Sequence, residues 1–301
     1  MLNGTSPEWC SDAHYQYIER LALALSEDLM ATSKHYGAHG WGGIFSRGAG
    51  GFDYKQTKSR FIFDELCKWS RQRSSVTTVC EVGFMAGHTS MLFLEVASRA
   101  RVVSFDLGQE AMVPWLCKQS QRLAKAYGKR WLGVVKGDSR LTVPYYAKQQ
   151  QPPFKCDVSF VDGGKTVAMR YTDYLNFNKL SYPGALLFFD EATSLGCVNG
   201  SAPHVDHCRY QGGLGGKHLH DKSTVHSAMG TYRAAREGVF SVEKCRWTPG
   251  MEEANGVCAA HFATIDPARV MKREPWHGRT AGAVAPAAGK LVCTDKRLDA
   301  L

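Results

Sequence analysis

Three carboxylates and a lysine lie just after two short apolar runs, where they could hold a cation and move a proton. Asp162 ends one run and Lys165 follows it three positions later, while Asp190 and Glu191 end the next run. Adjacent strands of a parallel sheet bring their carboxyl ends to the same edge, so the three acids should converge and repel one another unless a cation neutralises them. Hard oxygen ligands suit Mg²⁺ or a similar divalent ion, so this pattern predicts a metal site held by Asp162, Asp190 and Glu191.

Each of these residues also has a simpler explanation. Acidic residues at strand ends often cap the next helix, which could be the whole role of Asp190 and Glu191. Lys165 could be an ordinary residue in the first turn of a helix, with its ammonium in solvent. Beside a divalent ion, the pKa of that ammonium would fall, and Lys165 could then accept a phenolic or alcoholic proton as a general base.

A second group of residues could bind a cofactor that carries a ribose. The apolar run at 76–82 leads into Glu81-x-Gly83-x-x-x-Gly87, whose two glycines allow the backbone to approach a ligand closely. This spacing differs from the Gly-x-Gly-x-x-Gly of a pyrophosphate cradle. The next run ends in Asp106, whose carboxylate can accept hydrogen bonds from both ribose hydroxyls.

The third apolar run is followed by Asp138 and Ser139, either of which could meet the edge of an adenine ring. An acid at the first run, an acid at the second and a Gly-Asp pair at the third suit a cationic cofactor with a ribose and an adenine. The predicted cofactor-binding residues are Glu81, Gly83, Met85, Gly87, Thr89, Asp106, Asp138, Ser139 and Asp162.

Five short apolar runs alternate with helical patterns in the middle of the chain, which predicts a parallel sheet with helices on both faces. After residue 190 this rhythm stops, and a helix followed by two strands with Pro-Gly and Asn-Gly turn signals predicts an antiparallel pair. The expected fold is a doubly wound, Rossmann-like α/β sheet of seven strands, mostly parallel with a late antiparallel strand. The predicted strands are 76–82, 102–105, 132–135, 158–161, 185–189, 239–247 and 257–264, and the helices between and around them are 14–33, 56–73, 88–100, 114–127, 140–149, 165–180 and 224–238.

The order of the Glu81–Gly87 turn, Asp106 and Gly137-Asp138 resembles the class I S-adenosylmethionine-dependent methyltransferases. The resemblance covers about residues 56–264, including the late strand pair. It implies S-adenosyl-L-methionine as the cofactor. A Rossmann-like domain that binds NAD, or no cofactor, is the alternative.

The acceptor side resembles the metal-dependent small-molecule O-methyltransferases of the catechol O-methyltransferase type. The 28 positions from Asp162 to Asp190, with a helix and a Pro-Gly turn between them, fit that family's layout. The resemblance implies that the three acids hold the metal, that Lys165 removes a proton, and that the methyl group passes in line to a hydroxyl of a small molecule. Glu191 departs from the Asn of that type. The Asp-Gly-Gly string that begins at Asp162 also resembles a bacterial sugar and small-molecule methyltransferase group, which usually has His at the position of Lys165.

Other functions stay open. The chain could be a metal-independent N- or S-methyltransferase, or a non-catalytic module that binds an acidic partner through residues 111–150, where there are eight basic residues and one acid. That basic stretch lacks the interleaved aromatics of a nucleic-acid surface. His204, His207 and Cys208 could hold zinc, although their spacing matches no standard finger, and a histidine of this loop could instead bind the acceptor or act as an auxiliary base.

The expected organisation has three parts. An N-terminal helix and cap segment occupies 1–55, and a partly ordered tail occupies 265–301. The methyltransferase domain lies between them at 56–264 and carries a lid insertion at 192–223. Irregular segments at 30–55 and in the lid would select the acceptor.

The 301 residues are 44% apolar and 22% charged, which excludes a disordered or fibrous chain. No apolar stretch approaches the roughly 20 residues needed to span a bilayer, and the first ten residues show no leader pattern. The ten cysteines are scattered without a Cys-x-x-Cys pair, which favours a reducing compartment and hence the cytoplasm, while sequons at Asn3 and Asn199 leave a secretory alternative. We expect a small-molecule acceptor, no nucleic-acid partner and no membrane span, and we leave a homodimer open.

Overall fold

The computed structural model describes most of the predicted domain. The described residues are 8–32, 54–72, 76–108, 113–150, 154–164, 166–192, 222–247 and 256–265. Lys165, nearly all of the predicted lid, the zinc candidates and the tail after 265 lie outside the described residues. The domain boundaries given above therefore stay predictions.

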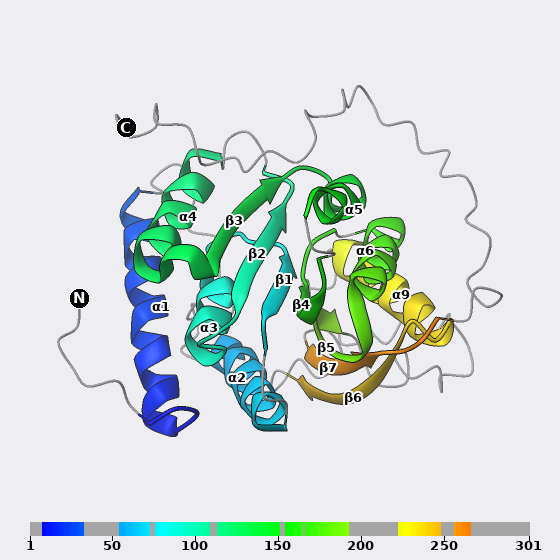
Figure 1. Cartoon of the computed structure of the whole chain (residues 1–301), viewed down its shortest axis with the longest axis horizontal. Helices are drawn as coiled ribbons and strands as arrows, with labels where there is room; N and C mark the ends of the chain where they lie inside the picture. Colours follow the sequence, from blue (N-terminus) through cyan, green and yellow to red (C-terminus); the bar gives the residue numbers. More distant parts are fainter. Residues whose placement is uncertain are drawn as a thin grey trace, which may run out of the picture.

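One seven-stranded sheet forms the centre of the described structure (Figure 1). Its strand order is β3-β2-β1-β4-β5-β7-β6; the first five strands along the chain are parallel, and β7 runs antiparallel to both β5 and β6. This arrangement confirms the predicted fold class. The strands are β1 (Thr78–Val82), β2 (Arg101–Asp106), β3 (Trp131–Lys136), β4 (Cys156–Val161), β5 (Ser181–Ala192), β6 (Phe240–Trp247) and β7 (Gly256–Phe262).

Helices cover both faces of this sheet, as Figure 1 shows. One face packs against α1 to α4 and the other against α5, α6 and α9, each through its own hydrophobic core. The helices are α1 (Asp12–Thr32), α2 (Tyr54–Gln72), α3 (His88–Val96), α4 (Val113–Tyr127), α5 (Ser139–Gln149), α6 (Val167–Leu180) and α9 (Lys222–Arg236), and a short 3₁₀ turn, η2 (Gly128–Arg130), follows α4.

The central strands are apolar throughout because successive side chains enter opposite cores. Val79 and Phe188 pack on the α1–α4 side, whereas their neighbours Cys80 and Phe189 pack on the α5–α9 side. Period-2 alternation places both sets in a dry interior, which is why the sequence shows continuous runs instead of alternating polarity.

The sheet changes its winding direction between β1 and β4. From β1 the chain adds β2 and β3 on one side, and it then returns to place β4 and β5 on the other. In open α/β sheets, ligands bind beyond the carboxyl ends of the strands at such a switch point. The fold therefore puts the residues after β1 and β4 where a ligand is expected.

Three disulfides join pairs of cysteines within the described part of the chain, which does not fit the reducing compartment that the scattered cysteines suggested. One bond ties the segment before α1 to α2, one links β1 with β4, and one links the paired strands β6 and β7. Disulfides persist in oxidising compartments, so the cysteines no longer support a cytoplasmic location. The pairs are Cys10–Cys67, Cys80–Cys156 and Cys245–Cys258.

No helix in the described part of the chain has the length and apolar character needed to cross a membrane.

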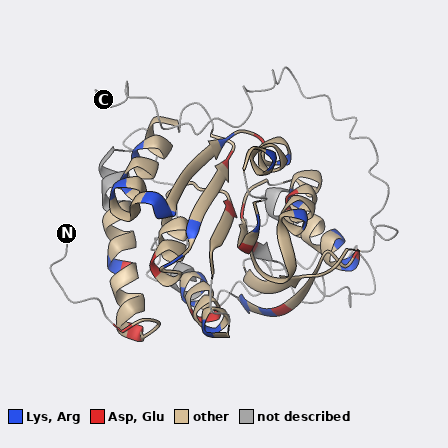
Figure 2. Cartoon of the chain, viewed as in Figure 1, with Lys and Arg blue, Asp and Glu red and all other residues tan. Residues whose placement is uncertain are grey.

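The basic residues between 111 and 150 do not form one surface. Figure 2 shows Lys and Arg on α4, which covers one face of the sheet, and on α5, which covers the other. Some of these cations are also used internally: Arg130 donates to the carbonyl of Leu94, and Arg140 pairs with Asp138. This division weakens the hypothesis of an acidic partner held by a single basic face.

Candidate active site

The turn after β1 is built from backbone conformations that few residues adopt. Gly83 and Gly87 have φ values of 98° and 73°, and Met85 between them has a φ of 44°. Asp106, at the end of β2, stabilises this turn because its Oδ2 accepts a hydrogen bond from the Met85 amide at 3.1 Å. Its Oδ1 accepts from the amide of Gly108 at 2.8 Å. The predicted ribose-binding acid thus lies directly beside the predicted cofactor turn.

The cofactor turn touches the loop that follows β4. A Cβ placed on Gly83 would lie 2.5 Å from the carbonyl oxygen of Asp162, so only glycine fits there. The Asp162 amide also donates to the Val82 carbonyl at 2.9 Å. Gly163 packs equally closely, because a Cβ there would lie 2.0 Å from a methyl carbon of Val82. The structure therefore brings the predicted cofactor turn and the first predicted acceptor-side acid together at the switch point.

Glu81 does not lie at the surface of this turn. Its side chain is fully buried, and its Oε2 accepts short hydrogen bonds from the hydroxyls of Ser90 and Ser104. Burial raises the pKa of Glu81 to about 8. The hydrogen bonds from the two serines favour the charged form and lower this pKa, but burial has the larger effect. In this position Glu81 supports the turn from within the domain.

The predicted adenine side is held by its own hydrogen bonds. Asp138 caps α5 by accepting from the Arg140 amide at 3.0 Å and also forms an ion pair with the Arg140 guanidinium. Partial burial would raise the pKa of Asp138, but the hydrogen bonds and the charge of Arg140 outweigh this effect and lower it. The Ser139 hydroxyl donates to Asp173 at 2.6 Å, and Thr89 is buried in the first turn of α3. The adenine contacts of Asp138 and Ser139 stay predictions.

A buried polar network on α6, absent from the sequence-based predictions, supports the loop after β4. Arg170 is fully buried; its Nη1 donates to the Val161 carbonyl at 2.5 Å, and its Nη2 lies 4.0 Å from Asp162 Oδ1. Asp173, one turn further along α6, accepts from Ser139, and burial raises its pKa to about 6. Arg170 and Asp173 are spaced as i and i+3 on one helix face, which is the signal that could have revealed the pair.

At the end of β5, Asp190 meets a lysine from α2. Val161 and Phe189 are register partners, so Asp162 and Asp190 follow paired positions of neighbouring strands, although β5 continues past Asp190 to Ala192. Lys58 Nζ donates to Asp190 Oδ1 at 2.5 Å, and both side chains are largely buried, with exposed fractions of 8% and 13%. Lys58 lies 132 residues before Asp190, and no local motif indicated this pair.

Glu191 belongs to the irregular end of β5, but its side chain lies outside the described residues, as does the whole of Lys165. Thr166, which follows Lys165, caps α6 by accepting from the Met169 amide at 3.2 Å. In the sequence, Lys165 therefore stands two positions before Val167, the first residue of α6.

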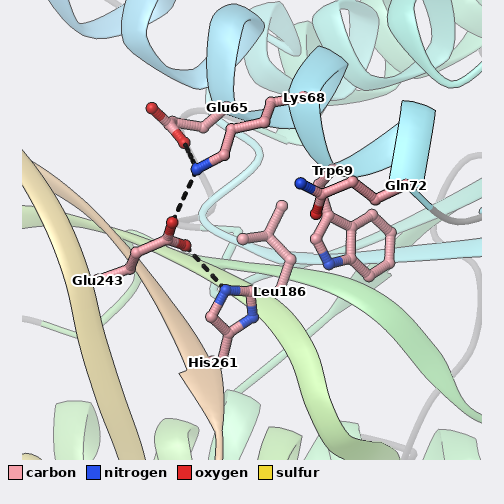
Figure 3. A pocket seen from close by; sticks show the side chains of 7 residues that line it. All are labelled: Glu65, Lys68, Trp69, Gln72, Leu186, Glu243 and His261. Atoms are coloured by element: carbon pink, nitrogen blue, oxygen red, sulfur yellow. Dashed lines mark hydrogen bonds and ion pairs between the residues drawn. The ribbon is translucent and has the colours of Figure 1, made fainter.

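A separate hollow of about 150 Å³ lies between α2 and strands β5, β6 and β7 (Figure 3). Lys68 pairs with Glu243 at 2.8 Å, and Glu243 also contacts His261 at 2.9 Å. Hydrogen bonds from Lys68 and His261 lower the pKa of Glu243. The charged groups that line this hollow pair with one another. Leu186, which also lines the hollow, lies four residues before Asp190 on β5. Its lining residues are Glu65, Lys68, Trp69, Gln72, Leu186, Glu243 and His261.

Residues 80–192 match a family model described as Methyltransferase domain. This range begins in β1 and ends with β5, so it contains the glycine turn, the ends of the first five strands and all three predicted acceptor-side acids. This match assigns a methyltransferase domain to that part of the chain. The parallel sheet with a late antiparallel pair is the fold predicted for the class I S-adenosylmethionine-dependent methyltransferases.

The fold is similar to that of a solved methyltransferase. An O-methyltransferase from Bacillus cereus, in complex with SAH, is 16% identical with a TM-score of 0.51, covering 83% of this chain and 97% of that one. The O-methyltransferase TomG from Streptomyces achromogenes, involved in tomaymycin synthesis and in complex with SAM, is 19% identical with a TM-score of 0.46, covering 66% and 78%. The Bacillus cereus likeness supports the fold of the methyltransferase domain alone. No curated protein matches the sequence.

Proposed function

We propose that this methyltransferase transfers the methyl group of S-adenosylmethionine to a hydroxyl oxygen of a small molecule. The observation that carries the proposal is the contact between Gly83 and Asp162, because it sets the cofactor turn directly against the loop that begins the acceptor side. A donor bound on that turn would lie beside the ends of β4 and β5. Such placement lets the acceptor oxygen and the sulfonium approach in line, and proximity supplies much of the rate in such transfers.

The cofactor would lie across the turn from Gly83 to Gly87. Asp106 is proposed to hold the ribose, since its carboxylate already lies within hydrogen-bond distance of the Met85 amide in that turn. Asp138 and Ser139 are proposed to border the adenine. Glu81 and Thr89 are buried, so we assign them a supporting part in the cofactor site.

Lys165 is proposed to act as the general base. A hydroxyl must lose its proton as the new C–O bond forms, and a base can assist only from about hydrogen-bond distance. In the sequence, Lys165 follows the tightly packed Asp162–Gly164 loop and precedes Thr166, the cap of α6. This role takes the hydroxyl proton onto the Lys165 amine as the methyl group is transferred.

The described residues do not fit the divalent ion that the resemblance implies. The carboxylate of Asp190 is already paired with the buried ammonium of Lys58, and Asp162 has the buried guanidinium of Arg170 nearby. A metal ion on Asp190 would have to displace Lys58, and breaking a buried ion pair typically costs about 3–5 kcal/mol. Within the described ranges, no group of three His, Cys, Asp or Glu residues could hold a metal ion. We therefore derive no step through a metal.

The proposed function can be tested with methyl-labelled S-adenosylmethionine and a panel of phenols, catechols, alcohols, amines and thiols. The expected product carries the label as an O-methyl ether, identified by nuclear magnetic resonance. Asp106→Ala serves as the matched cofactor-site control and should lose turnover. Label found on nitrogen or sulfur, with none on oxygen, would overturn the proposal. If calorimetry detects no binding of S-adenosylhomocysteine, the proposal that S-adenosylmethionine is the methyl donor is wrong.

A further inference from the structure

We use the term acceptor edge for the ends of β4 and β5 around Asp162 and Asp190. Each of these two acids has a positively charged side chain close to it. Asp190 is paired with Lys58, and Asp162 lies near Arg170. Arg170 is fully buried, and Lys58 is nearly so. The acids were expected to require a divalent ion because two or three carboxylates at one edge repel one another. Two of them instead have positive side chains of this chain beside them.

The Lys58–Asp190 pair is built into the fold. Lys58 comes from α2, which packs against α3 and against strands β6 and β7, while Asp190 lies near the carboxyl end of β5. At Asp190 the ladder between β5 and β7 is irregular, between Phe189 and Ala192. Such irregularities redirect side chains beside functional sites. Both partners are withdrawn from solvent, so each charge helps to compensate the other.

The geometry points to Lys58 as the resident cation of the acceptor site, in the place where the sequence suggested a divalent metal ion. This inference rests on the proposed function, because it concerns how that function holds its acceptor. Lysine is a single point charge with N–H donors, whereas a divalent ion can ligate two oxygens at once. A site organised by Lys58 therefore holds one acceptor oxygen and does not require a vicinal pair of hydroxyls.

Binding of Mn²⁺, followed by electron paramagnetic resonance, tests this inference without any acceptor. The wild-type protein and Asp190→Asn should bind Mn²⁺ equally weakly, because Asp190 is already compensated. Lys58→Met removes the ammonium and keeps much of the stem, so Mn²⁺ affinity should rise at least about tenfold, equivalent to about 1.4 kcal/mol. That gain should disappear in the double variant with Asp190→Asn. Lys58→Arg keeps the charge and should behave like the wild type.

A wild-type Mn²⁺ site that Asp190→Asn abolishes would overturn the inference, and this comparison does not depend on whether Lys58→Met folds. A folded Lys58→Met protein with unchanged Mn²⁺ affinity would overturn it as well. Circular dichroism of each variant checks that it folds. Binding of S-adenosylhomocysteine to each variant checks the proposed cofactor site separately. Failure of the proposed function would appear in cofactor binding or in the linkage of the transferred methyl group, whereas failure of this inference would appear in Mn²⁺ binding.

Discussion

Replacing Glu81 with Gln should change how the stability of the domain depends on pH. The Glu81 carboxyl is fully buried beneath the cofactor turn, and burial raises its pKa from 4.5 to about 8. Between those values the folded protein keeps a proton that the unfolded chain has released. The stabilisation linked to this proton is complete below about pH 4.5 and is lost as the pH rises toward 8.

The size of the effect follows from the same two pKa values. Each unit of pKa difference is worth about 1.4 kcal/mol, so raising the pH from 5 to 8 should lower the wild-type free energy of unfolding by about 3–4 kcal/mol through Glu81 alone. Glu81→Gln removes this titration. Its Oε can still accept from Ser90 and Ser104, but its amide nitrogen falls where Oε1 has no hydrogen-bond partner among the described residues. That buried amide should cost about 1–3 kcal/mol.

The variant should therefore be less stable than the wild type at pH 5 and should match or exceed it at pH 8. Urea unfolding monitored by circular dichroism, with the disulfides intact, measures both curves. Ser104→Ala is a useful second variant because it removes a hydroxyl that favours the charged form, so its loss of stability should continue to higher pH. A constant difference between wild type and Glu81→Gln from pH 5 to 8 would refute the assignment of a raised pKa.

Three further outcomes are expected. Asp106→Ala should weaken S-adenosylhomocysteine binding by about 1–3 kcal/mol, the usual cost of a lost hydrogen bond to a charged group, and unchanged affinity in calorimetry would exclude it from the ribose site. Lys165→Arg should lower kcat about 10²–10⁴-fold with little change in cofactor affinity, since arginine cannot act as a base, and near-normal turnover would place the base elsewhere. Cys10→Ser removes the bond to Cys67 and should lower the free energy of unfolding by about 2–4 kcal/mol, which denaturation under oxidising conditions measures. No loss there would mean that the pair is reduced in the folded protein.

The arrangement of the sheet was predictable because its signals are local. Each central strand is a short apolar run bounded by turn residues, and each intervening helix has its own periodicity. The helix expected at 140–149 is α5 (Ser139–Gln149), and the strand expected at 158–161 is β4 (Cys156–Val161). The ends of β1, β2 and β4 also fall next to Gly83, Asp106 and Asp162, as the sequence suggested.

The contacts that define the acceptor edge were not predictable in this way. A lysine in an amphipathic helix looks like a surface residue, and only the packing of α2 brings Lys58 to Asp190, 132 positions away. Arg170 and Asp173 likewise look like ordinary polar residues of a helix, yet both are fully buried. The cysteines gave no spacing motif, and their pairing depends on which strands become neighbours. Whether a buried charge is neutralised depends on partners that lie far away in the chain, as Lys58 does from Asp190. A single sequence does not show which distant residues become neighbours.

These long-range contacts join the two halves of the site physically. Ser139, at the start of α5 on the cofactor side, donates to Asp173, while Arg170 on the same helix donates to the carbonyl of Val161 beside the acceptor loop. On the other side of that loop, Gly83 leaves no space between the cofactor turn and Asp162. Close-packed interiors deform little, so a shift of one loop must move the others. Because in-line transfer tolerates little misplacement of donor and acceptor, we expect this packing to keep the proposed cofactor turn and the loop after β4 in a fixed relation.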